Sequence, residues 1–197
     1  MHICAKFAVV VLTAAAPFSA AAQSSNPAND LRAIYDPTPR VTSVSTSLRR
    51  ERGASARAPL YLDFRTTHPD TVPSRPLEVF ELSLTVAVAE ANGHHFTGVG
   101  EATLLVDDSV KIALKGEHRA AEWTERIVFP VSLSQALKLS KARSVHGRIG
   151  AWEFDLTPGE IARIGRLVAY ARLEPGAPVP DRWIVSPDEF SGTGRAP

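Results

Sequence analysis

Residues 80–89 have the sequence FELSLTVAVA, in which apolar side chains alternate with polar or small ones. The apolar positions, which share one side of an extended chain, are Phe80, Leu82, Leu84, Val86 and Val88. A helical period of 3.6 residues fits this run less well than a period of two. The stretch therefore predicts a β-strand with one buried face.

Asn92-Gly93 follows this strand and is a pair favoured in two-residue hairpin turns, because both positions require positive φ. We expect the chain to reverse there and residues 94–106 to pair with 77–91. A regular ladder would point Glu101 into the core. We therefore expect a β-bulge at 98–100, where two glycines stand, that turns Glu101 outward.

Shorter alternating runs predict further strands on both sides of this hairpin. They cover residues 41–48, 60–64, 110–114, 127–131, 145–149 and 152–156. Asp107-Asp108 predicts a turn, and residues 116–122 a loop. Gly150-Ala151 predicts a type II′ turn within the last hairpin, because glycine stands at its first position.

Two short helices are predicted from their N-terminal caps. Ser132 with Gln135 forms a capping box, and Thr157 with Glu160 forms a second one with proline at the first helical position. The second helix carries an apolar stripe from Ile161 to Ala171, and the sequence EPG at 174–176 ends it.

Together these elements predict a mainly β (α+β) protein. We expect an antiparallel meander sheet or a β-sandwich of about six to eight strands, with two short helices, the last one C-terminal. A parallel α/β fold is disfavoured because most connections are too short for crossovers.

The N-terminal segment predicts export. It has a weakly basic start, an apolar block too short to span a membrane, and the sequence AAA at 20–22 before a polar stretch. We expect residues 1–22 to be a cleaved signal peptide and the protein to be periplasmic or secreted. Residues 23–40 are expected to form a polar linker, 41–174 a single β-rich domain, and 175–197 a disordered tail rich in proline and glycine.

Composition limits the partners of the mature chain. Cys4, the only cysteine, is removed with the signal, so no disulfide is expected. Without Lys6 the 21 remaining Lys and Arg balance the 21 Asp and Glu. This balance gives no general attraction to nucleic acid or anionic lipid. We expect no nucleic-acid partner, no transmembrane segment in the mature chain and no cofactor.

A metal site is one functional hypothesis. In an up-and-down meander the tips near 92–95 and 116–122 lie at the same end of the sheet. That arrangement would bring together His94, His95, Glu117 and His118, which are ligand types suited to zinc or copper. The alternative is that these residues decorate solvent-exposed tips, since neighbouring histidines on a strand point to opposite faces.

Support in the sequence for a catalytic site is weaker than for a metal site. The chain has no Gly-x-Ser-x-Gly elbow and no Ser-x-x-Lys sequence. Glu101 and Glu125 are carboxylates with apolar neighbours and could be perturbed acids, but we expect them on the solvent-exposed face of the sheet. We assign no catalytic residue.

A partner-binding patch is a third possibility. Arg163, Arg166 and Tyr170 are expected on the last helix opposite its apolar stripe, where they would suit an acidic partner or lipid headgroups. The alternative is a solvated helix face.

These observations favour an exported, non-catalytic domain that binds a protein, glycan or lipid of the cell envelope. A periplasmic or secreted hydrolase, possibly metal-dependent, is the alternative. A carrier of small apolar ligands is the third hypothesis, and it would require the sheet to close around a hollow.

Overall fold

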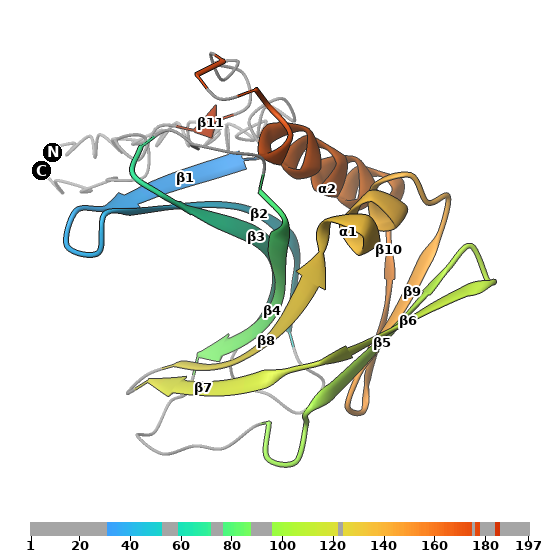
Figure 1. Cartoon of the computed structure of the whole chain (residues 1–197). Helices are drawn as coiled ribbons and strands as arrows, with labels where there is room; N and C mark the ends of the chain where they lie inside the picture. The colour runs from blue at the N-terminus through green and yellow to red at the C-terminus, as the bar shows by residue number, and fades with distance from the viewer. Residues whose placement is uncertain are drawn as a thin grey trace, which may run out of the picture.

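A computed structural model describes residues 31–52, 59–71, 77–87, 96–121, 124–174, 176–177 and 184–185. These residues form two β-sheets packed face to face with two helices, as a β-sandwich (Figure 1). The prediction of a mainly β protein with two helices, the last one C-terminal, is confirmed.

The large sheet has the strand order β11-β1-β2-β3-β4-β8-β7. Its strands are β1 (Leu31–Asp36), β2 (Val41–Arg52), β3 (Pro59–Pro69), β4 (Val79–Ala87), β7 (Glu117–Ala121), β8 (Thr124–Ser132) and β11 (Ile184–Val185). All neighbours are antiparallel except β1 and β11. A register shift between Ser47 and Arg49 marks a β-bulge in β2, which bends that strand.

The small sheet has the order β10-β9-β5-β6 and is antiparallel throughout. Its strands are β5 (Glu101–Val106), β6 (Val110–Lys115), β9 (Val145–Ile149) and β10 (Trp152–Leu156). The turn at Asp107-Asp108 is confirmed, and both residues have positive φ. The β9–β10 hairpin is also confirmed: Gly150 has a φ of 60° and Ala151 has no positive φ, as a type II′ turn requires.

The two helices are α1 (Leu133–Ser140) and α2 (Pro158–Ala171), and both predicted capping boxes are present. Each cap side chain accepts a hydrogen bond from the third helical N–H, and Gln135 or Glu160 reaches back to the cap backbone. The helices pack against each other on the same side of the large sheet as the small sheet (Figure 1). No helix among the described residues is long and apolar enough to span a membrane.

A single apolar core lies between these layers. Its largest fully buried apolar side chains from the large sheet are Phe64, Phe80, Phe129, Leu31, Leu62, Leu84 and Ile127. The rings of Phe64 and Phe80 stack with centroids 5.6 Å apart. The alternating apolar positions of the sequence therefore form the inner face of the sheet, as predicted.

The predicted pairing of residues 94–106 with 77–91 is wrong. β4 has β3 on one side and β8 on the other, and β5 belongs to the small sheet, where it pairs with β6 and β9. The predicted bulge against β4 therefore has no ladder to interrupt. Glu101 is nevertheless exposed and Ala102 buried, as expected. The Asn92-Gly93 turn lies outside the described residues.

Two stretches expected to be irregular are strands. β7 lies in the predicted loop 116–122 and pairs with β8, so the chain passes from the small sheet to the large one through Gly116. β1 lies in the predicted linker 23–40 and pairs with β2. Residues 1–22, including the predicted cleavage site, are outside the described part of the chain.

Candidate functional site

The face of the large sheet turned away from the core is called the outer face here. It consists of the alternate residues of six neighbouring strands, placed by the ladder register. Its residues are Arg32 and Ile34 on β1; Ser43, Ser45 and Ser47 on β2; Tyr61, Asp63, Arg65 and Thr67 on β3; Val79, Glu81, Ser83 and Thr85 on β4; Arg126, Val128 and Pro130 on β8; and Glu117 and Arg119 on β7.

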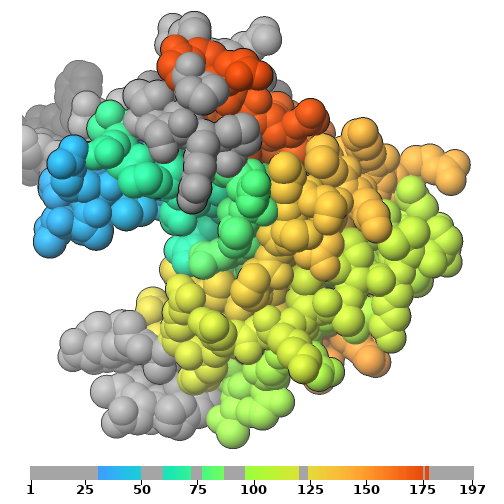
Figure 2. Space-filling view, in the orientation of Figure 1, coloured from blue at the N-terminus to red at the C-terminus, as the bar shows by residue number. Residues whose placement is uncertain are grey.

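The outer face is concave. The strands of the large sheet curve away from the helices and the small sheet in Figure 1, and the space-filling view shows a hollow between the β1–β3 part and the β7–β8 part (Figure 2). Burial agrees with this shape, because Ser83 and Val128 are only 2% and 1% exposed although they face away from the core. The hollow therefore has a floor that is largely shielded from solvent.

An ion-pair network crosses the outer face. Arg65 on β3 and Glu81 on β4 are directly paired residues, and their side chains form a salt bridge. The Arg119 guanidinium on β7 lies 4.0 Å from a Glu81 carboxylate oxygen and donates to Glu117 at 3.2 Å. These four charges compensate one another across the hollow.

Asp63, next to this network on β3, is a half-buried carboxyl. Desolvation raises its pKa above the ordinary 3.8, while a hydrogen bond from Ser47 and the charges of Arg126 and Arg65 act in the opposite direction. Among the described residues, no Lys, Arg or His nitrogen lies within 4.0 Å of the Asp63 carboxylate, so Asp63 forms no salt bridge with them. The partial burial of this charge is thus not fully compensated within the fold.

Arg126 on β8 is the corresponding cation. Its Nε donates to the Thr85 hydroxyl at 3.1 Å, and no carboxylate of the described residues lies within 4.0 Å of its guanidinium. Burial lowers its pKa, and repulsion from Arg65 adds to this effect. A partly desolvated guanidinium without an ion pair is poised to bind an anion from outside the fold.

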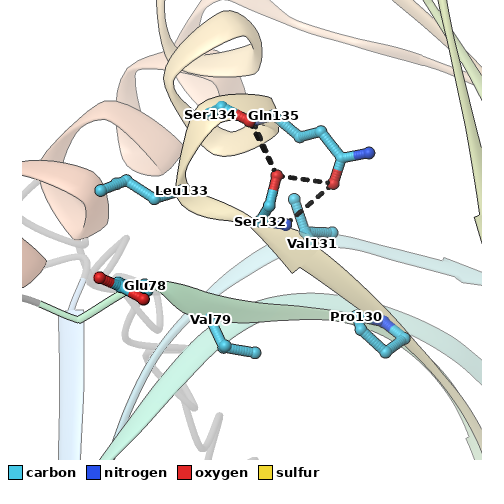
Figure 3. A pocket seen from close by; sticks show the side chains of 8 residues that line it. All are labelled: Glu78, Val79, Pro130, Val131, Ser132, Leu133, Ser134 and Gln135. Atoms are coloured by element: carbon cyan, nitrogen blue, oxygen red, sulfur yellow. Dashed lines mark hydrogen bonds between the residues drawn. The ribbon is translucent and has the colours of Figure 1, made fainter.

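A shallow, open groove of about 600 Å³ adjoins the outer face where β8 runs into α1. In Figure 3 the side chains of Val79 and Pro130, both outer-face residues, point away from the helix. The capping-box residues Ser132 and Gln135 lie on the other side of the groove, where they hydrogen-bond to each other. Val79 is 62% exposed, so the outer face has an apolar margin beside its charged centre.

The arrangement can recognise a ligand only through side chains. β2, β3, β4 and β8 each have a neighbour on both sides, so their backbone N–H and C=O groups serve the ladders. The side chains over these strands are mainly hydroxyls and charges, which donate and accept hydrogen bonds. A floor of this kind suits a polar ligand.

The residues predicted as a metal site are not assembled by the described structure. Glu117 and His118 point to opposite faces of β7: Glu117 pairs with Arg119 on the outer face, and His118 Nε2 lies 2.5 Å from Glu125 Oε1 on the inner side. His94 and His95 lie outside the described residues. Within the described residues no three His, Cys, Asp or Glu side chains form a metal-binding group, and the hypothesis stays a prediction.

Glu125 was expected on the solvent face, and this expectation is wrong. It is 1% exposed, and its carboxylate accepts hydrogen bonds from the Phe96 backbone N–H at 3.0 Å and from His118. It occupies an inner-face position because the register places it opposite Val86. These contacts hold the segment at Phe96, which precedes β5, against the β7–β8 hairpin. Glu125 therefore has a structural role.

The helix residues predicted to bind a partner are placed differently from one another. Arg163 is partly buried and donates to the backbone oxygens of Ser47 and Leu48 at 3.2 and 3.3 Å, and Arg166 is also partly buried. Tyr170 was expected on an exposed helix face, and this expectation is wrong. Its side chain is 2% exposed, and its hydroxyl lies 2.7 Å from His68 Nε2. α2 contacts both α1 and the large sheet, so more than its apolar stripe is buried.

Sequence reasoning missed the outer-face charges as a site. The alternation around Leu62 and Phe64 predicted that Asp63 and Arg65 would face solvent. Nothing in that pattern shows that six strands bend and enclose these side chains. The available signal was the repeated charge and hydroxyl at alternate positions of 61–67 and 81–85.

No family model, no curated protein and no solved structure matches the chain. The geometry and chemistry of the site itself therefore indicate the function.

Proposed function

We propose that this protein is an exported, non-catalytic binding protein whose binding site is the concave outer face of the large sheet. One observation carries the proposal: the hollow is lined by partly buried charges, and two of them, Asp63 and Arg126, have no ion-pair partner among the described residues. Asp63 and Arg126 attract each other, but without a salt bridge this attraction offsets their burial only in part. Partly buried charges of this kind cost stability and are typical of functional sites. A ligand bearing the complementary groups would compensate both.

Export is the part of the proposal supported by the N-terminal sequence. A short apolar block followed by small residues at 20–22 is the pattern that signal peptidases cleave. We propose a periplasmic or secreted protein that begins after Ala22. Intact-mass measurement of the protein recovered from its host tests this, because an uncleaved chain would contradict export.

A hydrolase is the second candidate, and Asp63 is the observation that favours it. A carboxyl whose pKa is raised by burial is suited to act as a general acid in a cleft. The salt bridge between Arg65 and Glu81 counts against a free second carboxylate on the same floor. Release of product from a bound oligosaccharide, abolished in Asp63→Asn, would favour this candidate over simple binding.

The third hypothesis, an apolar-ligand carrier, gains little support. Such a carrier needs an enclosed apolar cavity. The groove beside α1 is open, and the space between the sheets is filled by one continuous cluster of apolar side chains. Val79 and Pro130, which line the groove, can contact only an apolar part of a ligand.

The site is tested by mapping contacts in solution. Isotope-labelled protein is titrated with neutral and acidic oligosaccharides, short peptides and lipid vesicles, and backbone NMR shifts are followed. The proposal expects shifts to concentrate at β2, β3, β4 and β8 around Ser83. Shifts confined to the small sheet or to the exposed side of α2 would contradict it.

A further inference from the structure

We propose that the ligand of the outer face is an acidic oligosaccharide, with Arg126 binding a sugar carboxylate and Asp63 accepting a hydrogen bond from a sugar hydroxyl. This inference rests on the function proposed above and assigns the chemistry of its ligand. It follows from charge complementarity at two positions and from the kind of surface that separates them.

Arg126 is the anion-binding element. Only its Nε has a hydrogen-bond partner among the described residues, the Thr85 hydroxyl, so the two terminal nitrogens are left for a ligand. Thr85 fixes the plane of the guanidinium, and a planar guanidinium binds a carboxylate through two parallel hydrogen bonds. The partial burial of Arg126 strengthens such a contact, because the surrounding dielectric is lower than that of water.

Asp63 is the complementary acceptor. An ionised carboxylate accepts several hydrogen bonds, and the Ser47 hydroxyl provides one of them. A sugar hydroxyl can provide another without adding charge. Asp63 would repel a ligand carboxylate placed directly against it, so it favours a ligand that presents hydroxyl groups beside its carboxylates, as the sugar units of an oligouronate do.

The two side chains are spaced for one extended ligand. Asp63 stands on β3 opposite Ser83, and Arg126 stands on β8 opposite Thr85, with β4 between them. Strands lie about 4.8 Å apart, so β3 and β8 are about 10 Å apart. A short oligosaccharide spans this distance, whereas a single small anion would reach only Arg126.

The floor between the two charges favours a saccharide over a peptide. Extended peptides usually bind by adding a strand to a sheet edge, and β3, β4 and β8 have no free edge. Helical peptides need an apolar groove, but Ser83 and Thr85 make this floor polar. Tyr61, which is paired with Thr85 on the same face, adds an aromatic ring of the kind that packs against apolar sugar faces.

The test uses isothermal titration calorimetry on the full chain, expressed for export and purified. The probes are trigalacturonate and trimannuronate, with neutral maltotriose and a triglutamate peptide as comparisons. The variants are Arg126→Gln and Arg148→Gln. Arg148 lies exposed on β9 of the small sheet, so its substitution removes the same charge away from the outer face. Thermal unfolding verifies that both variants fold.

We expect at least one acidic trisaccharide to bind the unchanged protein, and Arg126→Gln to weaken that binding by about tenfold or more. Arg148→Gln should alter it less than about twofold. Raising the salt concentration should weaken binding to the unchanged protein and have less effect on Arg126→Gln. Maltotriose, which has no carboxylate, should bind more weakly than the acidic trisaccharides.

Other outcomes overturn the inference, and they separate it from the proposed function. If neither acidic trisaccharide binds, or if Arg126→Gln and Arg148→Gln behave alike, the ligand assignment is wrong. If triglutamate alone binds and loses affinity in Arg126→Gln, the saccharide is wrong but the outer face remains the site. If trigalacturonate binds but shifts the NMR signals of another surface, the proposed binding face is wrong as well.

Discussion

The two faces of the large sheet are built from the same strands but have opposite physical characters. On β3 the inner residues Leu62 and Phe64 are 1% and 0% exposed and pack in the core. Their neighbours Asp63 and Arg65 lie on the concave outer face and are only partly buried. The core gives the inner face its stability, and the curvature gives the outer face its shielding.

The comparison shows that burial has a different energetic meaning on each side. On the inner face, burial of apolar area stabilises the fold at roughly 25 cal/mol per Å². On the outer face, partial burial of Asp63 and Arg126 opposes folding because no ion pair among the described residues offsets it. Substitutions on the two faces should therefore change stability in different directions and by different amounts.

The largest difference is expected between Phe64→Ala and Thr67→Ala, which lie on opposite faces of β3. Phe64 is fully buried and stacks on Phe80, so its truncation leaves a cavity and should lower the free energy of unfolding by about 3–5 kcal/mol. Thr67 is exposed, and its change should stay within about 0.5 kcal/mol. Urea unfolding measures both, and equal losses would break the contrast between the faces.

The next largest effect extends the contrast to the small sheet. A Cβ added at Gly147 would lie 2.1 Å from the Phe154 ring, so Gly147→Ala forces that ring to move. We expect a loss of about 1–3 kcal/mol. Gly100→Ala is the matched control, because nothing lies within 4 Å of its added Cβ and its φ lies outside the positive range. A thermal midpoint that falls only for Gly147→Ala would confirm a tight inner face on both sheets.

A buried polar contact on the inner face comes third. The Tyr170 hydroxyl lies 2.7 Å from His68 Nε2, and Tyr170→Phe leaves that ring nitrogen without its partner. We expect a loss of about 1–2 kcal/mol. Burial also raises the pKa of Tyr170 to about 12. Above pH 10 the unfolded chain releases this proton while the folded one keeps it, so stability should fall from pH 10 to 12.

The Tyr170→Phe variant lacks this titration and should show a flatter stability curve over that range. Chemical unfolding at pH 9, 10 and 11 compares the two proteins. If both decline equally, the phenol does not carry the pH dependence, and its buried contact with His68 is weaker than the geometry indicates.

Local sequence patterns predicted the parts of this fold that depend on neighbouring residues. The alternation of 80–89 gave the inner face of β4, and both capping boxes formed as predicted because cap and partner lie three residues apart. The β9–β10 hairpin followed from its glycine turn in the same way. Such features need no knowledge of which distant segment lies alongside.

Strand order could not be predicted by the same reasoning. The sequence favoured pairing residues 94–106 with β4, but β8 occupies that side of β4, and β5 crosses to the small sheet. Alternation alone cannot choose between two partners that both present apolar residues. The candidate site was missed for this reason, because Asp63 and Arg126 meet in one hollow only when β8 lies beside β4.

The smallest expected effect tests whether the outer face opposes folding. Asp63→Asn keeps the size of the side chain and an acceptor for Ser47 but removes the charge. Because burial raises the folded pKa of Asp63 above 3.8, the folded protein holds this proton more tightly than the unfolded chain. Stability from protonation is therefore fully present below pH 3.8 and is lost as pH rises through the folded pKa.

At pH 7 the Asp63→Asn variant should thus equal or exceed the unchanged protein in stability, by no more than about 0.5–1 kcal/mol. Its advantage should disappear as the pH falls below 4, where Asp63 becomes neutral in both states. Glu117→Gln is the control, since Glu117 is 70% exposed and should give no such pH-dependent difference. Urea unfolding at pH 3.5, 5 and 7 separates the cases. A loss of more than about 1 kcal/mol at pH 7 in Asp63→Asn would mean that the carboxylate stabilises the sheet, and the outer face would then be a structural network and not a site awaiting a ligand.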